Sequence, residues 1–182
     1  LEEQADTHNI ALHYSQNGEE RQEEFSLVVL SVGVAAPKTV RSIRGTVGVR
    51  LNKYSFCAAD PFSPLDTSKE GIFVAGAFSG PKDMAHSIAQ ASGAALRAAQ
   101  IAARNGGGRS DQTALVVGGG VSGLTASLGL ANRGIAVHLV DAGDALGGRA
   151  RTIRSVVGTE NPQEKLKALV EAVQGSERIT LH

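Results

Sequence analysis

A glycine-rich turn in the second half of the chain constrains its fold more than any other feature. Residues 113–117 form an apolar run, Gly118-x-Gly120-x-x-Gly123 follows at once, and residues 122–132 have the character of a helix. Ile135–Asp141 is then a second apolar run. This order of strand, turn, helix and strand raises the glycine motif above chance. It predicts an α/β fold with a Rossmann-like parallel sheet and flanking helices.

Each glycine of the motif has a mechanical role in binding a dinucleotide. Gly118 permits the turn out of the strand, Gly120 lets the backbone approach a pyrophosphate, and Gly123 allows the helix to pack closely on the strand. The phosphates would lie at the start of the helix, beside Val121 and Ser122, where free N–H groups and the helix dipole favour anions. The alternative is a turn that only tightens a corner between strand and helix.

The residues after the second strand favour FAD. Asp141 lies 21 residues after Gly120, where a carboxylate, followed by Ala142, can accept hydrogen bonds from the adenosine ribose and disfavours NADP. Gly147-Gly148-Arg149 follows. FAD domains of the glutathione-reductase-like class resemble this pattern, which implies that the glycines admit the cofactor and that Arg149 approaches its phosphates. Arg149 could instead be an ordinary surface arginine.

The first half of the chain predicts a hairpin and a buried strand. Asn9–Tyr14 alternates apolar and polar residues and ends at an Asn-Gly turn, and the acidic stretch Glu19–Glu24 is interpreted as a solvated hairpin arm. Phe25–Ser31 is an apolar run typical of a strand buried on both faces. Residues 34–70 show no convincing period, so we expect them to be mostly loop.

Three further elements are expected around the glycine motif. Gly71–Ala77 predicts a short buried strand, and Met84–Ala103 an alanine-rich helix whose small side chains allow close approach to a sheet. Asn161-Pro162 opens another helix, because asparagine caps a helix and proline suits its first turn. The chain breaks off in a strand-like run at residues 178–182 and begins without Met, so we interpret it as a fragment of a longer protein.

Composition excludes several functional classes. The 182 residues carry no net charge, which argues against nucleic acid as a partner. Cys57 is the only cysteine, so the chain cannot hold a complete Fe–S ligand set, and the histidine spacing makes a metal site improbable. No run approaches the length of a membrane span and no signal peptide is visible. We therefore expect a cytoplasmic protein.

Four strings in the chain are similar to the FAD-containing A subunit of heterodisulfide reductase and its relatives. They are Thr67-Ser68, Gly71-Ile-Phe-Val-Ala-Gly76, Gly80-Pro81-Lys82-Asp83 and Ser87-Ile-Ala-Gln-Ala91. The resemblance covers most of residues 25–101 and 113–182. It implies an FAD-dependent oxidoreductase that transfers electrons beside Fe–S subunits or fused ferredoxin domains.

The family also implies a role for the start of the alanine-rich helix. In that class, this end of the helix approaches the pyrimidine edge of the flavin, so Gly76, Gly80, Pro81, Lys82 and Asp83 would bind the cofactor. Lys82 would add a positive charge that stabilises reduced flavin. The alternative is a proline-started helix with Lys82 in water. In the wider class the strand before this helix usually ends in Gly-Asp, and the Asp binds the ribityl chain. Here that Asp is replaced, after Gly76, by Ala77-Phe78, a position at which the close family also varies.

The two halves occur in reversed order relative to an ordinary FAD domain. We expect residues 1–104 to be the C-terminal half of an FAD module, 105–112 a linker, and 113–182 the N-terminal βαβ half. Either these are pieces of tandem modules, or they close into one circularly permuted domain with strands in the order Ile179, Val137, Leu115, Phe73. A second functional hypothesis is a truncated nucleotide-binding or assembly module, with ADP, NAD or no cofactor, without redox activity.

Overall fold

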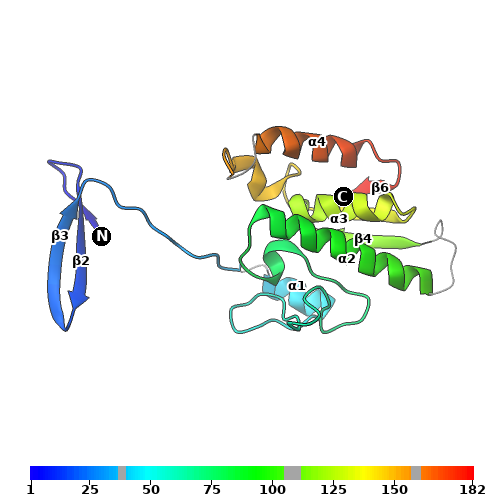
Figure 1. The fold of residues 1–182 in the computed structure, drawn as a ribbon, viewed down its shortest axis with the longest axis horizontal. Coiled ribbons are helices and arrows are strands. Elements are labelled where there is room, and N and C mark those ends of the chain that lie inside the picture. The colour runs from blue at the N-terminus through cyan, green and yellow to red at the C-terminus, as the bar shows by residue number, and fades with distance from the viewer. Residues whose placement is uncertain (37–39, 105–111, 157–160) are drawn as a thin grey trace. The chain divides into compact units, whose positions relative to one another are not determined.

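The computed structural model describes residues 1–36, 40–104, 112–156 and 161–182. They form two compact units, Leu1–Gly33 and Val34–His182, which are considered separately (Figure 1).

The first unit is a small antiparallel sheet. Its strands β1 (Glu2–Glu3), β2 (Ile10–Gln16) and β3 (Glu19–Phe25) pair in the order β1-β2-β3. Asn17 and Gly18 make the turn between β2 and β3 with φ of 55° and 86°, the left-handed geometry that an Asn-Gly hairpin favours. Every residue of β3 is exposed, so the predicted hairpin and its solvated acidic arm are confirmed.

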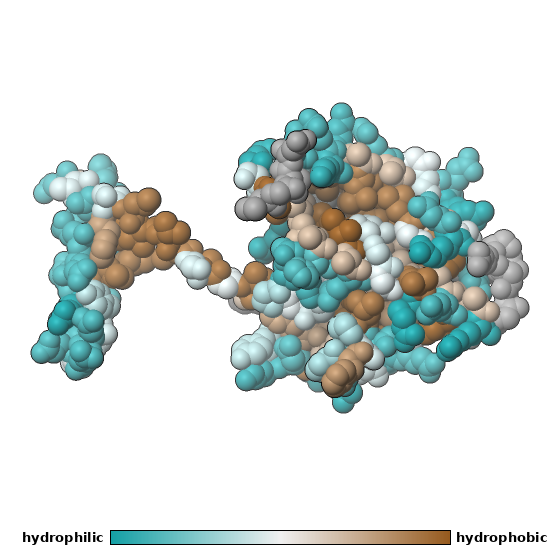
Figure 2. Space-filling model, viewed as in Figure 1, coloured by the Kyte–Doolittle hydropathy of each residue, from teal (hydrophilic) through white to brown (hydrophobic). Residues whose placement is uncertain are grey.

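The predicted strand Phe25–Ser31 is wrong beyond its first residue. Residues 27–36 adopt no regular structure, although the run is apolar. Leu27, Val29 and Val32 are each more than three-quarters exposed, and Figure 2 shows a hydrophobic surface where this segment leaves the hairpin. A strand buried on both faces needs neighbours on each side, and the described part of this unit pairs nothing with the run.

The second unit contains a parallel sheet. Strands β4 (Thr113–Val117), β5 (Ala136–Val140) and β6 (Ile179–Leu181) pair in the order β4-β5-β6, with Leu115 opposite His138. The predicted Rossmann-like fold and the predicted neighbours of these three strands are therefore confirmed. β4 hydrogen-bonds to no other strand among the described residues.

The predicted fourth strand, Gly71–Ala77, is not formed. Phe73 makes one isolated bridge to Asp66, and a 3-10 helix, η1, runs from Gly76 to Ser79. Gly71 and Gly76 both have positive φ, of 79° and 69°, which bends the chain at each end of the apolar run. The run does not pair with β4.

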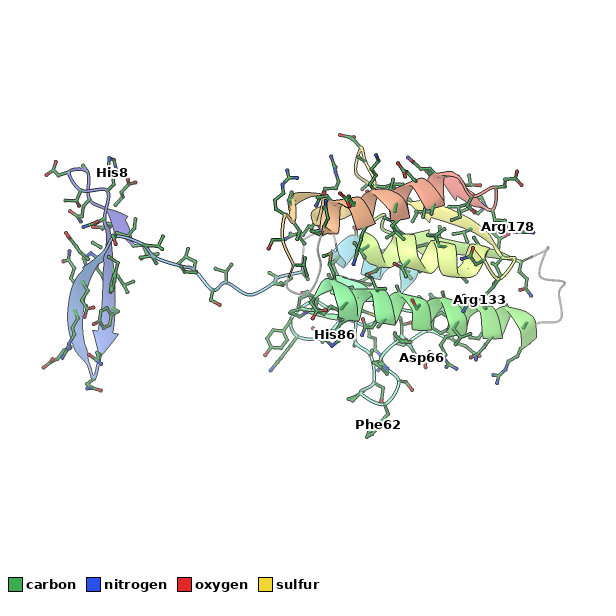
Figure 3. The ribbon with its side chains drawn as sticks, turned by 45° about the horizontal axis from the view of Figure 1, so that its top comes forward. His8, Phe62, Asp66, His86, Arg133 and Arg178 are labelled. Atoms are coloured by element: carbon green, nitrogen blue, oxygen red, sulfur yellow. The ribbon has the colours of Figure 1, made fainter. Side chains whose placement is uncertain are left out.

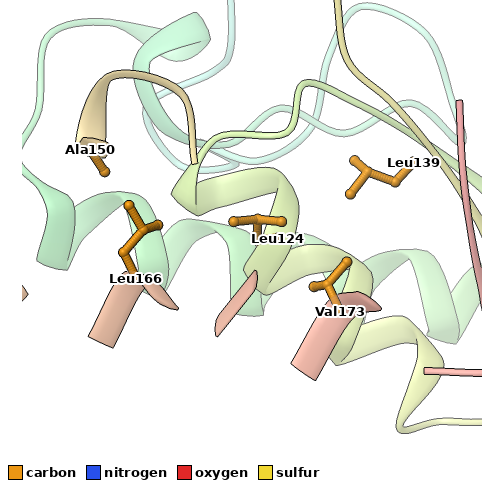
Figure 4. Close-up of a cluster of buried hydrophobic side chains, with 5 residues drawn as sticks. All are labelled: Leu124, Leu139, Ala150, Leu166 and Val173. Carbon is orange, nitrogen blue, oxygen red and sulfur yellow. The ribbon is translucent and has the colours of Figure 1, made fainter. Parts of the chain in front are cut away.

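Three helices pack on the same side of the sheet. They are α2 (Met84–Arg104), α3 (Val121–Ala131) and α4 (Pro162–Gln174). One buried cluster joins α3 and α4 to β5 and consists of Leu124, Leu139, Ala150, Leu166 and Val173 (Figure 4). A second places Ala95 of α2 against Leu130, Ile135 and Val137, so the predicted alanine-rich helix does approach the sheet closely.

The opposite side of β4 is open. Leu115 and Val117 are 67% and 60% exposed, whereas Val116 packs into both buried clusters. The alternation follows from the period of two in a strand. The flanking helices of the described part thus cover only one face.

The expectation of loop for residues 34–70 missed one helix. Helix α1 (Val40–Val47) has Val40 buried and Ile43 and Val47 half-buried, spaced three and four residues apart on one face.

The cap of α4 was predicted correctly: the Asn161 side-chain oxygen accepts the N–H groups of Gln163 and Glu164. The proposed linker lies outside the described residues except for Gln112.

Candidate functional site

The glycine turn is fixed by its own backbone. Gly118 has φ of 107° and donates its N–H to Val140 O at 2.7 Å, which ties the turn to β5. A Cβ on Gly123 would lie 1.7 Å from Gly118 O, far inside contact distance. Only glycine fits at 123, because α3 begins directly against the turn.

The space beside Gly120 is open. Gly120 is the N-cap residue of α3, and nothing lies within 4 Å of where its Cβ would be. The first N–H groups of α3, including those of Val121 and Ser122, have no partner within the helix. The geometry therefore presents donors and the positive end of a helix dipole at an accessible surface.

Asp141 organises the loops around this surface. Its Oδ2 accepts the N–H of Gly119, and its Oδ1 accepts the N–H of Gly143 at 2.8 Å. Each carboxylate oxygen keeps a further lone pair for a ligand hydroxyl. Gly119 was not among the predicted residues, although its position between two glycines was visible in the sequence.

The second glycine pair meets the first. Gly147 donates its N–H to Gly119 O at 2.7 Å, and a Cβ on Gly148 would lie 3.3 Å from the Gly120 Cα. Two motifs that were predicted separately thus form one wall of backbone. Ala142 and Arg149 are exposed at its edge, and their roles in binding stay predictions.

The 3-10 helix η1, which precedes α2, adjoins the first turn of α3 through Gly76. A Cβ on Gly76 would lie 2.1 Å from the Oγ of Ser122, so the two predicted halves of the site are in contact. Gly76 also donates its N–H to Gln90 Oε1 at 3.1 Å, which fixes η1 against α2.

Asp83 caps α2. Its Oδ1 accepts the backbone N–H of His86 at 2.7 Å, and this hydrogen bond holds the pKa of the Asp83 carboxyl below its usual range. Figure 3 shows His86 at the beginning of the helix. The described contacts of Asp83 are thus with the first turn of its own helix. Just before it, Pro81 is exposed and Gly80 has a φ of 140°.

Lys82 is half-buried rather than immersed in water. Its Nζ donates to the Oγ of Ser79, and desolvation lowers the pKa of the ammonium group. It lines a cavity of about 360 Å³ together with Cys57 and Gln90. Burial raises the pKa of the Cys57 thiol. Neither Cys57 nor Gln90 was among the predicted site residues, although Gln90 lies in the string Ser87–Ala91 that carries the family resemblance.

Two further features of the described residues concern metal ions and membranes. No group of three or more His, Cys, Asp or Glu side chains is placed to hold a metal ion there. His138 and His182 do approach each other, with 2.8 Å between Nδ1 and Nε2. None of the described helices is both long and apolar enough to cross a membrane.

The comparisons with known proteins support a dinucleotide-binding fold. The family described as NAD(P)-binding Rossmann-like domain matches residues 116–177. The A subunit of the H(2):CoB-CoM heterodisulfide,ferredoxin reductase of Methanothermobacter marburgensis is 40% identical over 78 residues, which are 42% of this chain and 12% of that protein. This chain is similar to the A subunit of heterodisulfide reductase. The resemblance expected from the sequence is confirmed.

Further relatives of this chain agree. An iron-sulfur A subunit of the CoB--CoM heterodisulfide reductase of Methanopyrus kandleri is 43% identical over 84 residues, 45% of this chain and 13% of that protein. The hydroxyneurosporene desaturase of Rhodobacter capsulatus is 47% identical over 45 residues, 25% of this chain and 9% of that protein. The matched part is thus about an eighth of the length of the heterodisulfide reductase relatives.

Proposed function

We propose that this chain binds FAD as the flavin-carrying part of an oxidoreductase that resembles the A subunit of heterodisulfide reductase. One observation carries the proposal. The open position at Gly120, at the start of α3, is walled by a second glycine pair whose Gly147 hydrogen-bonds to Gly119. A backbone surface without side chains, at a helix start, suits the pyrophosphate of a dinucleotide.

The chain's own residues would bind and orient the cofactor. The first N–H groups of α3 would donate to the pyrophosphate, and Asp141 would accept from the ribose with its remaining lone pairs. Gly148 would keep the approach free, and Arg149 would add positive charge near the phosphates. When bound, FAD supplies the redox chemistry, while the protein supplies position and charge.

FAD is preferred to NAD because of the start of α2. Gly76 touches Ser122, so the segment leading to Lys82 lies beside the proposed pyrophosphate site. Lys82 would then bring a partly desolvated positive charge towards the flavin, where it stabilises the reduced, anionic form. Gly80, Pro81 and Asp83 would hold this helix start in place.

We also propose that residues 34–104 and 113–182 work as one permuted module rather than as parts of two. The buried contacts of Ala95 with Leu130 and Val137, and the contact of Gly76 with Ser122, support this proposal. In the whole protein, electrons would pass between the flavin and Fe–S partners, since one relative is named as an iron-sulfur protein. The cytoplasmic location stays a prediction.

The test is to purify the chain, reconstitute it with FAD and titrate binding by flavin fluorescence. We expect yellow protein, and we expect Gly120→Val to abolish binding of both FAD and ADP. Gly45→Ala is a matched control, because nothing lies within 4 Å of a Cβ there and Gly45 is in α1. Unchanged affinity in Gly120→Val would refute the role of the turn. A folded, colourless chain that never takes up FAD would support the assembly-module hypothesis.

A further inference from the structure

The cavity below the start of α2 collects polar side chains from distant parts of the chain. Its volume is about 360 Å³, and Asn52, Cys57, Asp60, Ser79, Lys82 and Gln90 are among its lining residues. Their hydrogen bonds within the protein determine which groups remain for a ligand.

Gln90 has its acceptor occupied. Its Oε1 accepts the N–H of Gly76 and the hydroxyl of Ser79, both at 3.1 Å. Because a backbone N–H can only donate, the contact with Gly76 fixes which end of the amide is oxygen. The Nε2 donors have no partner among the described residues, so Gln90 offers hydrogen-bond donors to the cavity.

The amide of Asn52, on a separate loop, also has its oxygen occupied by backbone N–H groups. Its Oδ1 accepts the N–H groups of Tyr54 at 2.9 Å and Phe56 at 3.1 Å, which again fixes the amide orientation. Its Nδ2 donors are thereby left over, with no partner in the described part of the chain. Two amides thus arrive at one cavity with their oxygens occupied and their N–H groups available.

Lys82 adds the charge. It has three donors, and one contact is accounted for by Ser79 Oγ. A half-buried ammonium group gains from a negative partner, which replaces part of the lost hydration. Asp60 is the one carboxylate among the lining residues: it is exposed, as Asn52 is, and its Oδ1 already accepts the N–H of Phe62 at 2.8 Å.

We infer that this cavity is a binding site for an acceptor-rich group, a carboxylate or a ring bearing carbonyl oxygens, with Asn52 and Gln90 as neutral donors and Lys82 as the charge. A free small carboxylate is one source of this chemistry. The carbonyl-bearing ring of a bound flavin is the other, and that source rests on the function proposed above.

The variants Asn52→Asp and Gln90→Glu test the inference without disturbing the internal contacts. Each keeps the acceptor oxygen that the backbone uses and replaces the available NH₂ with a second acceptor. At mildly alkaline pH the new carboxylate repels an acceptor-rich ligand and attracts Lys82. Gln100→Glu is the matched control, because Gln100 is an exposed residue of the same helix.

Binding of oxalate, FAD and ADP to each variant separates the two sources. A free-carboxylate site predicts that oxalate binds the wild-type chain and binds both variants about tenfold more weakly or worse. A ring site predicts the same loss for FAD with ADP affinity unchanged. Gln100→Glu should match the wild type in every titration.

The outcomes also separate this inference from the proposed function. If Gly120→Val binds ADP normally, the proposed function fails while the oxalate titration still tests the cavity. If both cavity variants bind oxalate and FAD as the wild type does, the cavity inference is overturned, whether or not Gly120→Val loses FAD and ADP binding. Equal weakening of ADP and FAD in those variants would also overturn it, since ADP has no ring in the cavity.

Discussion

The glycine turn and the cavity at the start of α2 are built in opposite ways. Around the turn, backbone meets backbone: Gly123 lies against Gly118 O, and Gly147 hydrogen-bonds to Gly119. Around the cavity, side chains such as Gln90 and Lys82 make the contacts. Changes at the turn should therefore damage fold and binding together, whereas changes at the cavity should alter binding in a chain that stays folded.

The largest effect should come from Gly123→Ala. A methyl group 1.7 Å from Gly118 O must displace backbone, so the free energy of unfolding should fall by about 3 kcal/mol or more. Urea denaturation followed by circular dichroism measures this. The control Gly45→Ala should be neutral or stabilising by up to about 1 kcal/mol. A Gly123→Ala protein as stable as the wild type would show that the close backbone packing at Gly123 is not needed for the fold.

Asp141→Asn should cost less. One carboxylate oxygen becomes an NH₂ that faces the N–H of Gly119 or Gly143, so we expect a loss of about 2 kcal/mol in the same experiment. Asp144→Asn, an exposed residue of the same loop, should be neutral. Equal stability of the two variants would show that the carboxylate does not organise these loops.

Asp83→Ala tests the cap at the start of α2, next to the cavity, through the pH dependence of stability. The folded-state pKa of Asp83 is depressed, so its contribution is present above the unfolded pKa of about 3.9 and is lost as the pH falls through the folded value. The stability gap between the wild type and Asp83→Ala should be constant from neutral pH to about 4 and should narrow below that. A gap that widens in acid would contradict the capping role.

The smallest effect should come from the ion pair between Arg97 and Asp66, which ties the loop before Phe73 to α2 at 3.0 Å. Figure 3 shows Asp66 on this loop. Both side chains are substantially exposed, so a double-mutant cycle with alanine should give a coupling free energy of about 0.5 kcal/mol. A coupling several times larger would contradict the expectation that an exposed ion pair contributes little to holding this loop on α2.

Local patterns predicted the elements that are built locally. The βαβ order at 113–141, the alanine-rich helix and the Asn161 cap depend on neighbours in the chain, and each was found. Helix α1 was missed because its apolar spacing is short. The strands expected at Phe25–Ser31 and Gly71–Ala77 failed because a strand needs a partner, and apolar runs do not specify one.

The sequence by itself determined the glycine turn, since the steric demands at Gly118 and Gly123 arise within six residues of each other and only glycine meets them. Tertiary structure alone decided that Gly76 meets Ser122 and that Asn52, Lys82 and Gln90 share one cavity. The Asn52 oxygen is occupied by the nearby N–H groups of Tyr54 and Phe56, which is a local arrangement. The meeting of Asn52 with Lys82 and Gln90 joins residues far apart in the chain, and local spacing does not encode it. The donors left over at the cavity are a consequence of the whole fold.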